Sequence, residues 1–195
     1  MANFLYVDNS NLWIEGMHVA AVEAGLARDV SSAHEKRICD YTWKLDFSRL
    51  YEFAGGANVG RAVLFGSCAG PNDALWNAAH RCGFESIVHD RNMRNKEKKI
   101  DTSIVANMMK DSYERLRNGD EITLVAGDKD YVPALEMLLS REIPVHVVFW
   151  DHAADELKGL CTKFISLSPY VNFLRRRPDY RVERPRHHRS GDMRL

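Results

Sequence analysis

Residues 122–133 read ITLVAGDKDYVP, an apolar strand that runs into a polar turn and then a helix. The run 122–126 is apolar and is followed by a glycine, which is typical of a buried strand. Asp128 and Asp130 come next in the exit loop, and apolar residues then recur at helical spacing. Pro133 is tolerated near the first turn of that helix because the N–H groups there have no helical partner. The stretch therefore predicts a strand, an acidic loop and a helix in succession.

Apolar strands and amphipathic helices alternate along the rest of the chain. The pattern predicts further strands at 4–7, 61–65, 84–89, 145–150 and 164–167, and helices that begin near residues 9, 46, 71, 102 and 153. Residues 28–45 fit neither pattern, and residues 91–99 are expected to form a charged loop. Alternation of this kind favours an α/β fold with a parallel sheet that helices cover on both faces. Such sheets bind ligands at the carboxyl ends of their strands, near the switch in strand order.

The composition suits one intracellular domain. The chain has 195 residues, of which 45% are apolar and 28% are charged, as in ordinary globular proteins. No apolar run approaches the ~18 residues of a membrane span, and the N-terminus lacks the basic and apolar regions of a secretory signal. The cysteines form no Cys-x-x-Cys pair, so neither a zinc ribbon nor a disulfide framework is indicated. We therefore expect a cytoplasmic protein with free thiols.

The charge is divided unevenly along the chain. The whole chain is neutral, but residues 175–195 hold eight arginines and three acidic residues, a net charge of +5, which leaves −5 on the rest. A basic tail on an acidic body can mark contact with nucleic acid, and it can equally be a solvated terminal segment. We expect one domain over residues 1–173 and a flexible, arginine-rich tail over residues 174–195.

Carboxylates follow two of the expected strands. Asp8 ends the first strand, and Asp128 and Asp130 follow the strand quoted above, so parallel neighbours would bring all three to one edge of the sheet. Asp101 stands just before an expected helix and would join them from its N-terminus. Carboxylates held close together repel one another unless a cation lies between them. Oxygen ligands of this kind suit Mg²⁺ or Mn²⁺ better than zinc.

Three of the four carboxylates also have a purely structural explanation. Asp101 and Asp130 can cap the helices that follow them, and Asp8 can form a turn with Asn11. Gly-Asp-x-Asp is by itself a weak motif. The combination favours a site because these residues all lie at the edge of the sheet where such folds bind ligands.

Three segments resemble the motifs of NYN domains. Residues 6–12 (YVDNSNL) resemble the opening Asp-x-x-Asn motif, and residues 99–101 (KID) resemble a Lys-x-Asp segment before a long helix. Residues 124–133 match the strand and the Gly-Asp-x-Asp-Phe/Tyr-x-Pro segment, which is the most specific of the three. The resemblance extends to a closing helix and strand at 154–167 and covers roughly residues 3–173. The bacterial LabA-like branch is the most similar.

NYN domains are similar to PIN nucleases, and the resemblance implies a three-layer α/β/α sandwich with a mainly parallel central sheet. It also implies a ribonuclease that depends on Mg²⁺ or Mn²⁺ and leaves a 5′-phosphate and a 3′-hydroxyl. Carried over by position, the catalytic and metal-binding residues would be Asp8, Asp101, Asp128 and Asp130. Asn11 would orient Asp8 or contact the substrate, and Ser67, at the end of the second strand, would line the cleft.

An RNA substrate, single-stranded by preference, would need basic residues at the rim of an acidic site. Lys98 and Lys99 belong to the strongest local cluster, at residues 91–99, for which a solvated loop is the alternative. Lys129 stands between two candidate metal ligands and would reach a phosphate or point to solvent. The arginine-rich tail can add further phosphate contacts.

Other functions are either open or disfavoured. The alternative is a PIN-like module that binds RNA or a protein partner without turnover, although all four acidic residues are present. A phosphatase of the haloacid dehalogenase kind needs Asp-x-Asp after the first strand, and Ser10 stands where the second Asp would be. No Gly-x-Gly-x-x-Gly follows an expected strand, which argues against a dinucleotide site. No membrane partner is expected, and the question of a homo-oligomer stays open.

Overall fold

The computed structural model describes the backbone of residues 1–68, 73–90 and 96–177, and the side chains of residues 1–67, 74–89 and 99–177. Its strands are β1 (Asn3–Asp8), β2 (Val59–Cys68), β3 (Glu85–Asp90), β4 (Glu121–Val125), β5 (Val145–Phe149) and β6 (Lys163–Ser166). Its helices are α1 (Asn9–Glu23), α2 (Val30–Glu35), α3 (Phe47–Gly55), α4 (Asp73–Arg81), α5 (Lys96–Glu114), α6 (Val132–Ser140) and α7 (Asp155–Leu160). Two short 3₁₀ turns complete the set, η1 (Lys129–Tyr131) and η2 (Ser168–Tyr170).

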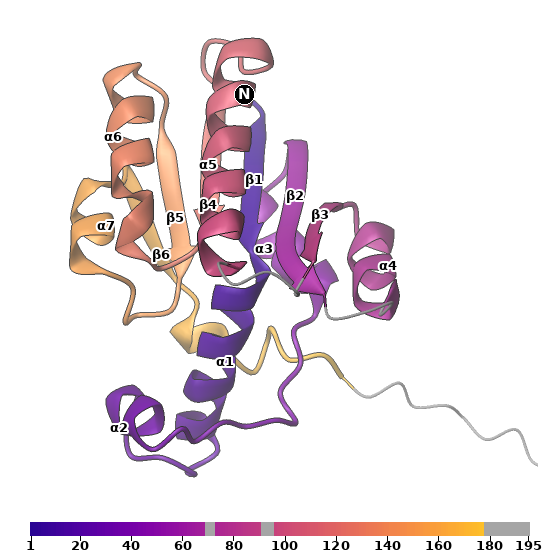
Figure 1. Ribbon diagram of the computed structural model, residues 1–195, viewed down its shortest axis with the longest axis vertical. Helices are drawn as coiled ribbons and strands as arrows, with labels where there is room; N and C mark the ends of the chain where they lie inside the picture. The colour runs from indigo at the N-terminus through magenta and orange to yellow at the C-terminus, as the bar shows by residue number, and fades with distance from the viewer. Residues whose placement is uncertain (69–72, 91–95, 178–195) are drawn as a thin grey trace, which may run out of the picture.

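In the described part of the chain the strands form one six-stranded sheet, and every neighbouring pair is parallel (Figure 1). The order is β3-β2-β1-β4-β5-β6. The chain therefore starts in the middle of the sheet, builds outward to β3, and returns to place β4 on the other side of β1. Because strand order switches between β1 and β4, a crevice is expected at the carboxyl ends of these two strands.

The residues of β1 divide the core in two. Leu5 and Val7 pack in a cluster with α1, α3 and α4, while Phe4 and Tyr6 pack in a cluster with α5, α6 and α7. Helices thus cover both faces of the sheet, and the predicted three-layer α/β/α sandwich is confirmed. Since side chains alternate along a strand, Asp8 continues the face of Phe4 and Tyr6, which is the face that α5 covers.

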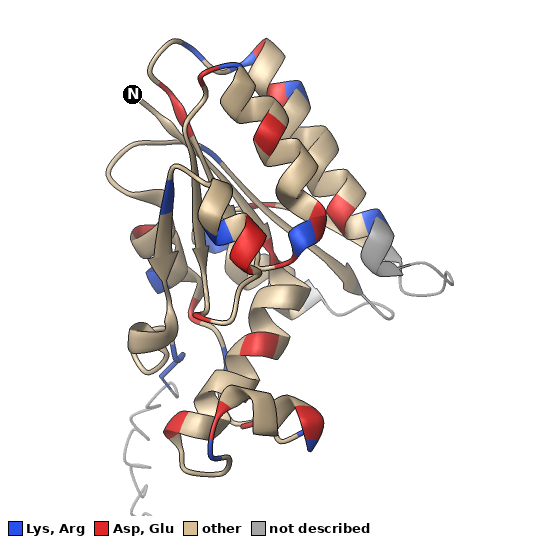
Figure 2. Cartoon of the chain, turned by 90° about the vertical axis from the view of Figure 1, so that its left-hand side faces the viewer, with Lys and Arg blue, Asp and Glu red and all other residues tan. Residues whose placement is uncertain are grey.

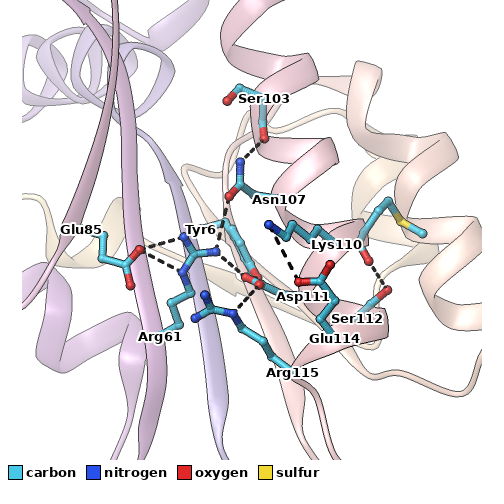
Figure 3. A network of polar contacts seen from close by, with 11 residues as sticks. Tyr6, Arg61, Glu85, Ser103, Asn107, Lys110, Asp111, Ser112, Glu114 and Arg115 are labelled. Carbon is cyan, nitrogen blue, oxygen red and sulfur yellow. Dashed lines mark hydrogen bonds and ion pairs between the residues drawn. The ribbon is translucent and has the colours of Figure 1, made fainter.

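A buried ion pair fastens α5 to the sheet. Asp111 is 1% exposed and accepts hydrogen bonds from the Tyr6 hydroxyl (2.6 Å) and from Arg61. Arg61 also pairs with Glu85 at 2.7 Å, and Arg115 pairs with Asp111 at 3.1 Å (Figure 3). Side chains of β1, β2 and β3 are therefore tied to one point on α5, which fixes where the rest of that helix lies.

The start of α5 corrects one prediction. The sequence predicts a charged loop over 91–99 and a helix from about residue 102, but the helix begins at Lys96. Lysine and glutamate are good helix formers, so a charged run extends a helix as readily as it forms a loop. Residues 91–95 lie outside the described residues.

No helix within the described segments is long and apolar enough to cross a membrane.

Residues 28–45, which the sequence pattern leaves unassigned, contain α2 and a buried segment. Trp43 is fully buried in the core beside α1 and α3. Asp40 pairs with Arg175 at 2.7 Å, so the chain that follows η2 returns to cover this segment. The predicted tail therefore begins with residues that contact the domain, and its remainder, 178–195, lies outside the described residues.

Candidate functional site

Asp8 ends β1 and is the N-cap of α1. Its Oδ1 accepts a hydrogen bond of 3.0 Å from the backbone N–H of Asn11, so the predicted turn is present. The residue is 5% exposed. Burial, which disfavours the charged form, raises the pKa of Asp8 to about 6; the nearby Asp101 adds to this, and the hydrogen bond from Asn11 opposes it.

Tyr131 links Asp8 to Asp101. Its ring is fully buried, and its hydroxyl oxygen lies 3.2 Å from Asp8 Oδ2 and 2.9 Å from Asp101 Oδ1. Burial and the two carboxylates raise the pKa of Tyr131, which keeps the phenol protonated. A phenol has one hydrogen, so the Tyr131 hydroxyl donates to only one of these two carboxylates at a time. Two carboxylates held this close repel each other, and a cation between them lowers that cost. Their oxygen donors therefore fit a divalent metal ion.

Asn11 holds the loop that follows β4. Its Oδ1 accepts a hydrogen bond of 3.0 Å from the backbone N–H of Gly127, whose carbonyl accepts one of 2.9 Å from Ala154. A Cβ on Gly127 would lie 2.2 Å from ring atoms of Phe149, so the close approach of the loop to this ring requires glycine. Asp128 follows and caps η1 through its side chain. The glycine of the Gly-Asp-x-Asp segment thus has a packing role.

A pocket of about 360 Å³ opens between α1, α5 and this loop. Its lining consists of Asp8, Ser10, Asn11, Ile14, Glu15, Ile100, Asp101, Asp128 and Asp130. Asp8 is buried, whereas Asp128 and Asp130 are exposed. The structure therefore brings the four predicted carboxylates together in one pocket. Figure 2 shows charged segments of both signs near the place where α1 leaves the sheet.

A second, larger pocket adjoins the first. It measures about 630 Å³ and is lined by Asp101, Thr102, Val105, Lys129, Asp130, Val132, Pro133 and Glu156. Asp101 and Asp130 line both pockets, so these two carboxylates lie where the pockets meet. Lys129 is exposed in this second pocket, beside apolar side chains.

The remaining predicted site residues lie elsewhere. Ser67 is two residues beyond Phe65, the register partner of Asp8, and is not among the described residues that line either pocket. Lys99 is an exposed residue of the first turns of α5. The backbone of Lys98 lies in the same helix, but its side chain is outside the described residues.

Sequence reasoning did not single out Tyr131 as a site residue. The aromatic position after Asp130 is part of the motif in residues 124–133, and this was the only signal that pointed to it. A buried tyrosine usually places its hydroxyl on a partner, but the sequence does not say which partner. The contact with Asp8 and Asp101 becomes visible only once β1, α5 and η1 are placed side by side.

A comparison with known families identifies the kind of domain. A family model for the NYN domain matches residues 26–168. The chain belongs to the NYN domain family. NYN domains are part of the PIN-like nuclease superfamily, so the predicted membership is confirmed. The match says nothing of the LabA-like branch, which stays a prediction, and no curated protein matches the chain at a significant level.

The family match and the pocket overlap only in part. Asp101, Asp128 and Asp130 of the NYN domain lie within the matched residues, whereas Asp8 and Asn11 precede them. The contacts of Tyr131 with Asp8 and of Asn11 with Gly127 join the unmatched β1–α1 corner to the matched part. The pocket is therefore lined by the β1–α1 corner, which lies outside the match, and by residues inside the match.

Proposed function

We propose that this NYN domain is a metal-dependent ribonuclease that hydrolyses RNA phosphodiester bonds at the carboxylate pocket. The observation that carries the proposal is the contact of both Asp8 and Asp101 with the single hydroxyl of Tyr131. With Asp128 and Asp130 these side chains would hold Mg²⁺ or Mn²⁺, which take carboxylate oxygens readily. When bound, such an ion would supply a more acidic water and stabilise the charge that develops on phosphate.

The protein fixes the carboxylates before a substrate arrives. The backbone N–H of Asn11 donates a hydrogen bond to Asp8, and the Tyr131 hydroxyl lies within hydrogen-bond distance of Asp101. The side chain of Asn11 holds the loop that presents Asp128. Side chains that are already in position need no rearrangement as the reaction proceeds, which lowers the barrier. Asp8 must be deprotonated to act as a ligand, and its raised pKa places that change near pH 6.

The larger pocket suits the RNA strand beside the reacting phosphate. Lys129 offers a positive charge for a phosphate, and Val132 and Pro133 offer apolar surface against which a base can pack. Unpaired bases reach such a surface more easily than paired ones, which favours a single-stranded substrate. Lys98 and Lys99, near the start of α5, are proposed as outer phosphate contacts.

The state of the cysteines bears on the cellular location. Three cysteines of the described chain, Cys39, Cys82 and Cys161, are free thiols. Free thiols suit a reducing compartment. We therefore propose that the protein acts on RNA in the cytoplasm.

The test is cleavage of a labelled single-stranded RNA in Mn²⁺ or Mg²⁺, with EDTA as the first control. Asp128→Asn removes an exposed carboxylate of the pocket without opening a cavity. Asp151→Asn is the matched control, because Asp151 is an exposed aspartate in the loop after the neighbouring strand β5. We expect metal-dependent cleavage to 5′-phosphate products by the wild type and by Asp151→Asn, and a loss of about 100-fold or more in Asp128→Asn.

Two outcomes would count against the proposal. Cleavage that survives both EDTA and Asp128→Asn would come from a contaminating nuclease or from another site. RNA binding without any cleavage by the wild type would make the domain a catalytically silent binding module. A Mn²⁺ titration followed by thermal melting tells whether the carboxylates bind metal in that case, because a ligand of the native state raises its stability.

A further inference from the structure

Two histidines and a glutamate meet at one point beside α1. Glu15 Oε2 lies 2.6 Å from His34 Nε2 and 2.7 Å from His152 Nε2. The three ligand atoms lie within 4.8 Å of one another. The side chains are 16%, 40% and 29% exposed in that order, so an ion can reach them from solvent.

Each of these side chains comes from a separately fixed segment. Glu15 lies in the middle of α1. His34 lies in α2, whose N-cap Asp29 accepts a hydrogen bond of 2.8 Å from a backbone N–H of the first turn. The turn that carries His152 is hydrogen-bonded to the carbonyl of Gly127 at 2.9 Å. The convergence of the three therefore does not depend on one mobile loop.

The ring of His34 is also held from its other side. His18 packs against it with ring centroids 4.2 Å apart. Nδ1 of His18 donates a hydrogen bond of 2.8 Å to the carbonyl of Ile38, which fixes the His18 ring. His34 thus lies between a fixed ring and Glu15, with Nε2 directed at the carboxylate.

We propose that Glu15, His34 and His152 form a binding site for Zn²⁺ or a similar transition-metal ion. Two imidazoles and one carboxylate are donors that zinc accepts, whereas Mg²⁺ and Ca²⁺ favour oxygen donors alone. In a tetrahedral zinc site, bonds of about 2.0–2.1 Å place neighbouring donor atoms about 3.3 Å apart. The two short contacts therefore need to lengthen by less than about 1 Å, and the two imidazole nitrogens, which lie within 4.8 Å of each other, need to approach by at most about 1.5 Å. A fourth position would remain for water.

We place the imidazole site apart from the ion that Asp8 would hold. Glu15 lines the carboxylate pocket, but it stands seven residues after Asp8, which is a rise of about 10 Å along a helix. Ions of a two-metal site are about 3.5–4 Å apart. The ion would instead join α2 and the turn of His152 to α1, and its binding energy would stabilise the fold. The proposal is independent of the nuclease activity.

The test is calorimetric titration of Zn²⁺ into the untagged 195-residue chain, with millimolar Mg²⁺ present to compete for the carboxylate pocket. The protein carries His187→Ala and His188→Ala, because adjacent histidines in the sequence would bind zinc on their own. His34→Ala and His152→Ala each remove one proposed ligand from a different segment. His80→Ala, an exposed histidine of α4, and Asp128→Asn are the matched controls. Metal-free melting curves show which variants are folded.

We expect one Zn²⁺ per chain and a loss of affinity of at least about 100-fold in both ligand variants, since even outer-shell changes cost 10- to 100-fold. The two controls should bind as the parent protein does. Co²⁺ should give a visible absorption band that His34→Ala abolishes. Zn²⁺ binding that is unchanged in His34→Ala and His152→Ala would overturn the proposal. Absence of binding by the parent protein would also overturn it, and would leave the three residues as an ion-pair cluster only.

Discussion

Asn11 and Gly127 stand 116 positions apart in the chain and are joined by a hydrogen bond of 3.0 Å, from the Gly127 backbone N–H to Asn11 Oδ1. Asn11 also donates its own backbone N–H to Asp8. One asparagine therefore fixes the first carboxylate and the loop that presents Asp128. The carboxyl ends of β1 and β4 are held in register by this residue as well as by the sheet.

Asn11→Ala tests the side-chain part of this role, because alanine keeps the backbone N–H that Asp8 accepts. The change leaves the buried N–H of Gly127 without its partner, which costs about 1–3 kcal/mol of unfolding free energy. Displacement of the loop should lower kcat for RNA cleavage by roughly 10- to 100-fold. Urea unfolding and cleavage assays measure the two effects. Asn77→Ala, at an exposed position of α4, is the control and should change neither. Normal kcat in a destabilised Asn11→Ala would show that the Asn11 side chain has no positioning role.

Asp8→Asn tests the charge buried at the pocket. The folded protein raises the pKa of Asp8 from 3.8 to about 6, so the stability that its protonated form contributes is full below about pH 4 and is lost as the pH rises through 6. We expect metal-free Asp8→Asn to be more stable than the wild type near pH 7.5, by up to about 3 kcal/mol, and the difference to disappear near pH 4.

Thermal melting in EDTA at the two pH values measures this difference. Adding Mn²⁺ near pH 7.5 should raise the Tm of the wild type and leave that of Asp8→Asn almost unchanged, because the variant lacks a ligand. A wild type that is the more stable protein in EDTA near pH 7.5 would contradict the raised pKa.

The layered fold could be predicted from the sequence because each strand is a short apolar run and each helix has an apolar face. The position of Asp8 could also be predicted, since a residue at a strand end belongs to the edge of the sheet whatever the strand order. Contacts between elements that are distant in the chain could not be predicted in this way. The pairing of Tyr131 with Asp8 depends on where η1 lies relative to the end of β1. The meeting of Glu15, His34 and His152 depends on α2, which lies in the unassigned segment 28–45.

Tyr131→Phe tests whether the phenol competes with metal for the carboxylates. The variant keeps the buried ring and removes the only hydrogen that Asp8 and Asp101 share. Without metal we expect it to lose about 1–2 kcal/mol of stability near pH 7.5. Because a bound cation balances the same charges, Mn²⁺ should raise the Tm of Tyr131→Phe by more than that of the wild type. An equal gain would mean that the hydroxyl does not compete with the metal, and a smaller gain would mean that it supports metal binding.

Asp111→Ala tests the attachment of α5. The change removes the buried carboxylate that accepts from Tyr6 and Arg61, and Arg61 keeps only its more exposed partner Glu85. Breaking a buried pair costs up to about 3–5 kcal/mol. Lys110→Ala is the control on the same helix, since its pair with Glu114 is exposed and worth less than about 1 kcal/mol. Asp111 stands ten residues after Asp101, about 15 Å along the helix, so cleavage per folded molecule should be unchanged. If urea unfolding gives the two variants the same loss of unfolding free energy, Asp111 does not attach α5 to the sheet.

Lys98→Ala combined with Lys99→Ala tests the proposed phosphate contacts near the start of α5. Each phosphate neutralised on a single strand contributes about 0.7 to the slope of log affinity against log salt, so losing two contacts should flatten the slope by about 1.4. Binding is measured in the Asp128→Asn background, where RNA should stay intact. Lys110→Ala is again the matched control, because it removes a lysine from the far end of the same helix. A flattened slope in the double variant alone would place the RNA at the start of α5. Equal slopes would move the strand away from this helix and toward Lys129 in the larger pocket.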